Sequence, residues 1–249
     1  AQRLAAGAGR RLDEASPFVD ARMPDGTRLH SVIPPIATAG TLLSLRIPNR
    51  SVFTLDELVE RGTVDAVGAQ WLRDIVAGRL AFLICGGTGS GKTTILSSLL
   101  GLVPSRERIV VVEDSSELVP DHPHCVRMQA RTANVEGAGV VTLRDLVRQA
   151  LRMRPDRIVV GEVRGAEVVD LLAAMNTGHE GGCGTIHANS AGDVPARLEA
   201  LGLMAGLDRL AVHALVAAGI DVVLHLQRSA VGRRFVAGVH VLTRDEAGF

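Results

Sequence analysis

A glycine-rich segment, GGTGSGKTT at residues 86–94, carries the clearest chemical signal in the sequence. Its spacing is that of a P-loop, in which a glycine and four further residues are followed by Gly-Lys and then Ser or Thr. The glycines let backbone N–H groups curl around phosphate oxygens. Lys92 is expected to reach the β- and γ-phosphates, and the Thr93 hydroxyl to hold Mg²⁺. The predicted nucleotide-binding residues are Gly86, Gly87, Thr88, Gly89, Ser90, Gly91, Lys92, Thr93 and Thr94.

Two other interpretations of this segment fit less well. The dinucleotide-binding motif G-x-G-x-x-G fails, because Gly87, Gly89 and Gly91 are each two residues apart. A merely flexible glycine loop would not need the Lys-Thr pair or the strand-like apolar run at residues 80–84 before it. Of the 27 basic residues, Lys92 is the single lysine and all the others are arginines. A compact ammonium therefore stands where the motif requires one.

Carboxylates and a histidine follow the other apolar runs of the chain. These runs alternate with helical periods, which indicates a parallel sheet covered on both faces. Ligands of such sheets bind beyond the carboxyl ends of the strands, where carboxylates can hold Mg²⁺ and orient an attacking water. Each carboxylate alone is more often a helix cap than a catalytic group, so the combination with the P-loop is what favours catalysis. The residues concerned are Glu113, Asp114, Glu117, Glu162 and His187.

The first fifty residues have a different pattern. Short strands are expected at 18–23, 27–33 and 42–47, the first two joined by a Pro-Asp-Gly turn. Leu43, Leu45 and Ile47 share one face of the third strand. The chain starts inside an Ala/Arg helix and without Met, so we expect the beginning of this domain to be missing.

Two later segments have the marks of helix starts. Thr54 with Glu57, and Thr142 with Asp145, form capping-box patterns. The helix predicted at 142–153 also carries three arginines four residues apart, which suit either a solvated face or an interface near phosphate. Those arginines are Arg144, Arg148 and Arg152.

Composition limits the remaining possibilities. The chain has 249 residues, 47% of them hydrophobic and 2% aromatic, so a sizeable core must be built from aliphatic side chains. The formal net charge of zero provides no strong field for nucleic acid or anionic lipid, and no nucleic-acid partner is expected. The three cysteines form no C-x-x-C pair, and Cys85 extends an apolar strand, which predicts a buried packing residue. No apolar run approaches the ~20 residues of a membrane span.

Four motifs resemble those of the secretion and pilus-assembly ATPases. After the P-loop, RIVVVEDSSELVP at 108–120 looks like their Asp box, and LRMRPDRIVVGEVRG at 151–165 resembles their Walker B region. MNTGHEGGCGTIHANS at 175–190 is similar to their His box. The order is that of the type II/type IV secretion ATPase superfamily, and the resemblance is strongest to the tight-adherence (TadA/CpaF-like) pilus ATPases. It implies an α/β fold with a RecA-like P-loop NTPase core at 51–249, a mainly parallel sheet, and a small partial α/β N-terminal domain and linker at 1–50.

The resemblance also implies roles for individual residues. Glu117 is expected to activate water, with Glu113 as the alternative, while Thr93 and Glu162 hold Mg²⁺ and His187 senses the γ-phosphate. The expected further sensors, or residues reaching nucleotide across a subunit boundary, are His179, Arg46, Arg50 and Arg131.

The function implied is that of a hexameric, ATP-hydrolysing motor that uses Mg²⁺ and powers pilus assembly or protein secretion. Its expected partners are further copies of itself and an inner-membrane platform protein, and its expected location is the cytoplasmic side of that membrane. Two alternatives stay open. A P-loop small-molecule kinase would need an acceptor pocket and a lid, and a nucleotide-gated regulatory module would not hydrolyse ATP.

Overall fold

A computed structural model describes residues 1–48, 52–134, 136–178 and 180–243. The chain divides into two compact units. The first, the N-terminal unit, consists of residues 1–51 and 131–141, and the second, the motor unit, of residues 52–130 and 142–249. Nothing in the sequence pattern predicts that an eleven-residue segment from the middle of the chain joins the N-terminal unit.

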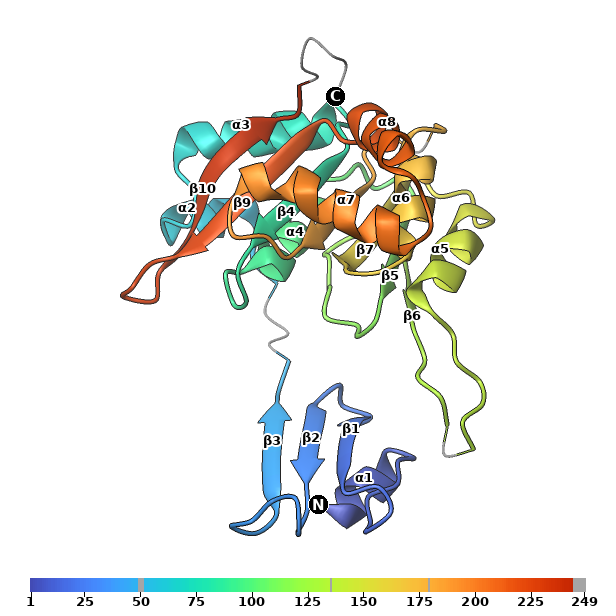
Figure 1. Ribbon diagram of the computed structural model, residues 1–249. Coiled ribbons are helices and arrows are strands. Elements are labelled where there is room, and N and C mark those ends of the chain that lie inside the picture. Colours follow the sequence, from blue (N-terminus) through green and yellow to red (C-terminus); the bar gives the residue numbers. More distant parts are fainter. Residues whose placement is uncertain (49–51, 135, 179, 244–249) are drawn as a thin grey trace. The chain divides into compact units, whose positions relative to one another are not determined.

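The N-terminal unit is a three-stranded antiparallel sheet with one helix (Figure 1). The sheet order is β1-β2-β3, and α1 packs its apolar residues on the first two strands, against Val19, Ala21 and Leu29. The bounds are α1 Gln2–Gly7, β1 Phe18–Arg22, β2 Arg28–Val32 and β3 Leu42–Arg46.

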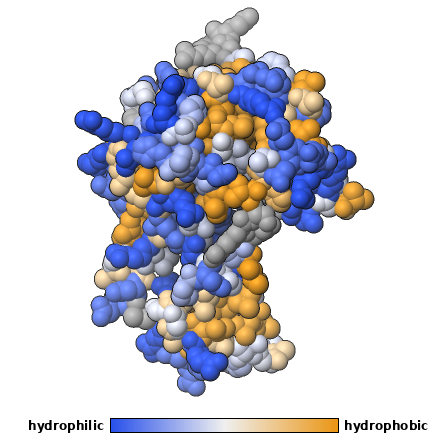
Figure 2. Space-filling view, turned by 180° about the vertical axis from the view of Figure 1, so that it is seen from behind, coloured by the Kyte–Doolittle hydropathy of each residue, from blue (hydrophilic) through white to orange (hydrophobic). Residues whose placement is uncertain are grey.

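Strand β3 of this unit is exposed along its whole length. In the register, Leu43 and Leu45 lie opposite Ser31 and Leu29, on the face that α1 covers for the other strands. Nevertheless Leu43 and Leu45 are half exposed and Ile47 more so. Figure 2 shows the resulting apolar area over β3. The predicted alternation is correct, but a single six-residue helix is too short to cover three strands.

The motor unit contains a seven-stranded sheet between two layers of helices (Figure 1). Its elements are α2 Leu55–Glu60, α3 Ala66–Ala77, β4 Phe82–Gly86, α4 Lys92–Leu100, β5 Ile109–Glu113, β6 Cys125–Gln129, α5 Leu143–Leu151, β7 Arg157–Val163, α6 Glu167–Met175, β8 Cys183–Ile186, the 3₁₀ turn η1 Ala191–Asp193, α7 Val194–Met204, α8 Arg209–Gly219, β9 Val222–Arg228 and β10 Arg234–Val241. No helix in the described part of the chain is both long enough and apolar enough to cross a membrane.

The sheet order is β10-β9-β4-β8-β7-β5-β6. All pairs are parallel except β10 with β9, so the carboxyl ends of β4, β5, β7 and β8 lie at one edge. Helices α2, α3 and α4 pack together on one face, and α5 to α8 on the other. The fully buried and mainly apolar strands β4 and β5 form the middle of the core, as the apolar runs predict.

Both predicted capping boxes are present, at the start of α2 and of α5. Strand β6 was not predicted, because its sequence CVRMQ is partly exposed at the sheet edge and lacks an apolar run.

Two of the arginines on α5 are neither freely solvated nor near the P-loop. The Nε atoms of Arg144 and Arg148 lie 2.7 and 2.8 Å from the two carboxylate oxygens of Asp170 and so connect α5 to α6.

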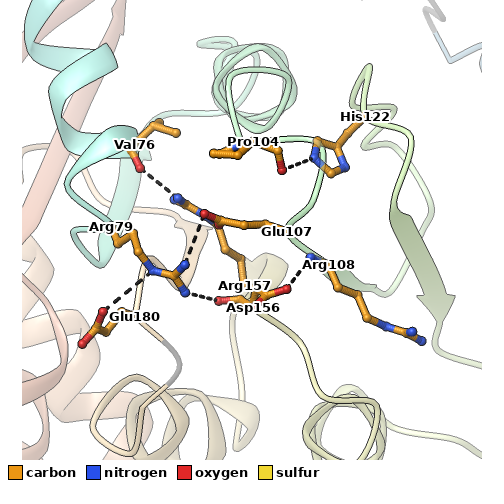
Figure 3. A network of polar contacts seen from close by, with 9 residues as sticks. All are labelled: Val76, Arg79, Pro104, Glu107, Arg108, His122, Asp156, Arg157 and Glu180. Carbon is orange, nitrogen blue, oxygen red and sulfur yellow. Dashed lines mark hydrogen bonds and ion pairs between the residues drawn. The ribbon is translucent and has the colours of Figure 1, made fainter.

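A buried ion pair organises the amino edge of the sheet, opposite the P-loop (Figure 3). Arg157, the first residue of β7, is 1% exposed and donates from Nε to Glu107 at 2.8 Å and from Nη2 to the Val76 carbonyl at 2.9 Å. The second Glu107 oxygen lies 3.2 Å from Arg79, which also approaches Glu180. These contacts join the loops that precede β4, β5, β7 and β8.

Candidate nucleotide-hydrolysis site

The P-loop connects the end of β4 to the start of α4, as predicted. Gly86, Gly89 and Gly91 have φ angles of 149°, 72° and 98°, in the region that favours glycine. A Cβ on Gly86 would also come within 2.4 Å of the Leu226 carbonyl oxygen on the neighbouring strand β9. Residues 87–89 at the crest are exposed, while the Ser90 side chain is buried. The loop is therefore an open cradle of backbone on a rigid strand.

Lys92 lies under this cradle and is 8% exposed. Its ammonium donates to the carbonyls of Gly86 and Gly87, at 2.8 and 3.0 Å, and approaches Nδ1 of His187 at 3.4 Å. Burial lowers the pKa of Lys92, and the nearby Glu162 carboxylate opposes that shift. The ammonium is thus held by weak carbonyl acceptors next to the position where phosphate oxygens would offer charged ones.

His187 connects Lys92 to Glu162. Its Nε2 lies 3.0 Å from Oε1 of Glu162, while its Nδ1 faces Lys92. Partial burial, together with the Lys92 charge, lowers the pKa of His187, and Glu162 works in the other direction. A neutral ring with the proton on Nε2 satisfies both contacts, because it accepts from Lys92 and donates to Glu162. The structure thus brings the P-loop, the Walker B glutamate and the His-box histidine together.

The two Asp-box glutamates differ in their surroundings. Glu113 is 3% exposed, and its Oε1 accepts from the backbone N–H groups of Glu117 and Leu118, each at 2.9 Å. Burial raises the pKa of Glu113 to about 7. Glu117, at the far end of the same turn, is partly exposed. Between them, Asp114 forms an ion pair with Arg164, and burial raises the pKa of Asp114.

The site fits a nucleotide and a magnesium ion on two observations. The hydroxyl of Ser90 is buried and has no hydrogen-bond partner among the described residues, so the loop holds a polar atom that a phosphate can satisfy. The oxygen donors of Thr93 and Glu162 are the kind that Mg²⁺ prefers. Within the described ranges, no group of three or more His, Cys, Asp or Glu residues could hold a metal ion. A Mg²⁺ ion here would draw on the Thr93 hydroxyl, the Glu162 carboxylate and phosphate oxygens.

Sequence reasoning missed three side chains next to the P-loop. Arg234, on β10, donates from Nε to the Gly89 carbonyl at 2.8 Å. Arg228 lies directly opposite Arg234 in the β9–β10 pair. His225, opposite Cys85 on β9, is 7% exposed and binds the Asn189 carbonyl just after His187. A histidine inside the apolar run VVLHL was the available signal, but no pattern predicts contacts across more than 140 residues.

Four predicted residues lie outside the described part of the motor unit. Arg46 lies on β3 and pairs with Arg28 in the register, within the N-terminal unit. Arg131 belongs to the same unit and donates from Nε to the Gly139 carbonyl at 2.7 Å. Arg50 and His179 lie outside the described residues.

Fold and site together define a P-loop ATPase with a RecA-like core. Comparison with known proteins makes this specific, because the model of the family described as "Type II/IV secretion system protein" matches residues 1–241. The chain belongs to that family. The predicted fold class and the predicted ATPase activity are thereby confirmed.

Three similar proteins illustrate the relationship. A Mycobacterium tuberculosis protein with a provisional conjugal-transfer name is 59% identical over 252 residues, covering 99% of this chain and 72% of that protein. The type IV secretion system protein PtlH of Bordetella pertussis is 36% identical over 247 residues, covering 86% of this chain and 71% of PtlH. The crystal structure of the VirB11 ATPase from the Brucella suis type IV secretion system, in complex with sulphate, is 25% identical, with a TM-score of 0.63 over 97% of this chain and 81% of that one.

Proposed function

We propose that this ATPase is the motor of a secretion, conjugation or pilus-assembly system and works as a homo-hexameric ring. The observation that carries the proposal is the direct link from Lys92 through His187 to Glu162 at the open P-loop. Membership in the type II/IV secretion family and relatives named for conjugal transfer and type IV secretion support the cellular role. Tight-adherence pilus assembly is the finer assignment that the sequence motifs favour.

Each side chain has a distinct task in hydrolysis. Lys92 exchanges the carbonyls of Gly86 and Gly87 for the β- and γ-phosphates of ATP, which are stronger acceptors. Glu117 orients and deprotonates the attacking water, because its carboxylate is the more accessible of the two Asp-box glutamates. His187 then senses the γ-phosphate through its contact with Lys92. A bound Mg²⁺ ion supplies charge neutralisation at the phosphates.

A neighbouring subunit of the ring can supply positive charge to the reaction. The γ-phosphate gains negative charge in the transition state, and an arginine supplied by a second subunit can raise the rate by about 10³–10⁵. Arg46, Arg50 and Arg131 of a neighbouring copy are the candidates for this role. This function also calls for a membrane platform protein as a partner, with the motor on the cytoplasmic side of that membrane. It calls for no nucleic acid.

Steady-state phosphate release tests the hydrolytic activity. We expect the wild-type protein to release phosphate from Mg-ATP without any acceptor, whereas Lys92→Ala does not. ADP formation that depends on an added acceptor, with the phosphoryl group found on that acceptor and no free phosphate released, would instead identify a kinase. Nucleotide binding with no release, under conditions that support the ring, would identify a regulatory module.

A mixing series tests the ring. Inactive Lys92→Ala subunits are added to wild type at fixed total protein, and activity is followed against their fraction. We expect a decline steeper than linear, because one inactive subunit affects its neighbours. A linear decline, with specific activity independent of protein concentration, would show a self-sufficient monomer.

A further inference from the structure

Three residues of the candidate site lie at or after the ends of adjacent strands of the sheet. Glu117 follows β5, Glu162 lies near the end of β7, and His187 follows β8. The strands are neighbours in the order β8-β7-β5. One residue on each strand contacts the next strand or loop: Glu113 and Thr185, which are buried, and Gly161, which is partly buried.

The first contact is made by Glu113. Its Oε1 accepts both N–H groups at the end of the Asp-box turn, so the side chain fixes the backbone of Glu117 itself. Its Cγ lies 2.6 Å from where a Cβ on Gly161 would be. Real Cβ atoms do not approach that closely, so the residue before Glu162 is a glycine because Glu113 occupies the space.

The second contact lies at an irregularity in the pairing of β7 with β8. Val160 pairs with Gly184 and Val163 pairs with Ile186, so two residues of β7, Gly161 and Glu162, face the single residue Thr185. This is a β-bulge, which re-aims a side chain and interrupts the ladder. The Thr185 hydroxyl, 2% exposed, donates to the Gly161 carbonyl at 2.6 Å and so satisfies an acceptor at the irregularity.

We propose that Glu113, Gly161 and Thr185 form a positioning row that sets Glu117, Glu162 and His187 relative to one another, and that Glu113 is a positioning residue and not the general base. The proposal rests on the proposed hydrolysis of ATP and adds the roles of these three residues.

The surroundings of Glu113 argue against a role as base. One carboxylate oxygen is engaged by two backbone donors, and the other, Oε2, is buried without a hydrogen-bond partner among the described residues. A general base must come within hydrogen-bond reach of the attacking water or reach it through one further water. Glu117 is partly exposed at the end of the turn that Glu113 holds, so the two glutamates have separate tasks.

Matched substitutions test the Glu113 contact. Glu113→Ala removes the acceptor of the two N–H groups, whereas Glu113→Gln keeps a carbonyl oxygen there. We expect kcat to fall about tenfold to a hundredfold in Glu113→Ala, as is typical when an outer-shell contact is lost, and to stay at least about tenfold higher in Glu113→Gln. Nucleotide affinity, measured by titration of a fluorescent ATP analogue, should change little in either variant.

A second pair tests the Thr185 contact in the same way. Thr185→Val removes the hydroxyl at nearly constant volume, and Thr185→Ser keeps it. We expect kcat to fall about tenfold in Thr185→Val and to be restored largely in Thr185→Ser, while the thermal melt confirms that both variants are folded. A purely structural role would lower the melting temperature without this separation of kcat from nucleotide affinity.

The outcomes separate this proposal from the proposed function. If the wild type releases no phosphate, the proposed function fails. If the wild type is active but Glu113→Gln is as inactive as Glu113→Ala, Glu113 is the base and the positioning role is wrong. Wild-type kcat in both Glu113→Ala and Thr185→Val would also overturn the row.

Discussion

The two edges of the central sheet differ in how their buried charged and polar side chains are paired. At the amino edge, Arg157 and Glu107 are buried and both Glu107 oxygens are paired with arginines. At the carboxyl edge, Lys92 is buried against backbone carbonyls, and the hydroxyl of Ser90 is buried with no partner in the described part of the chain. Unsatisfied buried polar groups cost free energy, and the Ser90 hydroxyl is one that a bound phosphate can satisfy. The amino edge also holds atoms that are unsatisfied among the described residues, the Nε atoms of Arg79 and Arg108, but its buried carboxylate is fully paired. One edge therefore ties the loops of the unit together, and the other offers a polar group to nucleotide.

The largest effect is expected from breaking the amino edge. Arg157→Met leaves Glu107 buried without its main partner, which should lower the free energy of unfolding by about 3–5 kcal/mol. Urea unfolding followed by circular dichroism measures this. Arg106→Met is the control, because Arg106 is exposed and stands next to Glu107 in the chain. Equal stability of the two variants would contradict the structural role of the ion pair.

Removing a carboxylate at the other edge should affect catalysis and leave stability nearly unchanged. Glu117→Gln and Glu162→Gln are each expected to lower kcat by about 10² or more, because they act on water or metal at the transition state. Phosphate release measures the loss, and nucleotide titration checks that binding persists. Normal hydrolysis by Glu117→Gln would return the role of base to Glu113.

Lys92→Ala tests whether the carboxyl edge is incomplete without nucleotide. Loss of charge-assisted hydrogen bonds should weaken ATP binding about tenfold to a hundredfold. The melting temperature without nucleotide should change little, because burial already disfavours this ammonium, as the lowered pKa of Lys92 indicates. Wild-type affinity in the variant would refute the assignment of the phosphate site.

Glu113 should also make stability depend on pH. Burial raises its pKa from 4.5 to about 7, and the hydrogen bonds from the Glu117 and Leu118 N–H groups oppose that shift. Between those values the native state keeps a proton that the unfolded state has lost, so stability falls as pH rises from 4.5 to 7. At about 1.4 kcal/mol per pKa unit, the contribution is about 3–4 kcal/mol. Unfolding of wild type against Glu113→Gln measures it, and parallel pH curves would disprove it.

The smallest effect concerns neither edge. Asp170→Asn removes the carboxylate that joins Arg144 and Arg148 across α5 and α6, and should lower stability by about 0.5–1 kcal/mol, less at high salt. A thermal melt at two salt concentrations measures the change. A loss of several kcal/mol would show that the contacts of Asp170 with Arg144 and Arg148 stabilise the protein as much as the buried Arg157–Glu107 pair does.

The sequence predicted the features that local physics determines. The P-loop spacing, the apolar strands of the parallel sheet and both capping boxes follow from neighbouring residues and were correct. It could not separate Glu113 from Glu117, because Glu113 ends β5, Glu117 follows one turn later, and the turn decides which one folds inward. It missed Arg234, whose contact with Gly89 joins residues 145 positions apart. Periodicity also could not show that α1 leaves β3 uncovered, since cover depends on a neighbour's length.

The composition of the N-terminal unit has a consequence for how this protein can be divided. Because residues 131–141 belong to that unit, the polypeptide passes between the two units three times, at residues 51–52, 130–131 and 141–142. Arg10 donates to the Ala133 carbonyl inside it. A shortened protein that begins at residue 52 would keep this eleven-residue arm without the sheet it folds with. A swap of whole units between two relatives would therefore have to exchange two separate pieces of the gene.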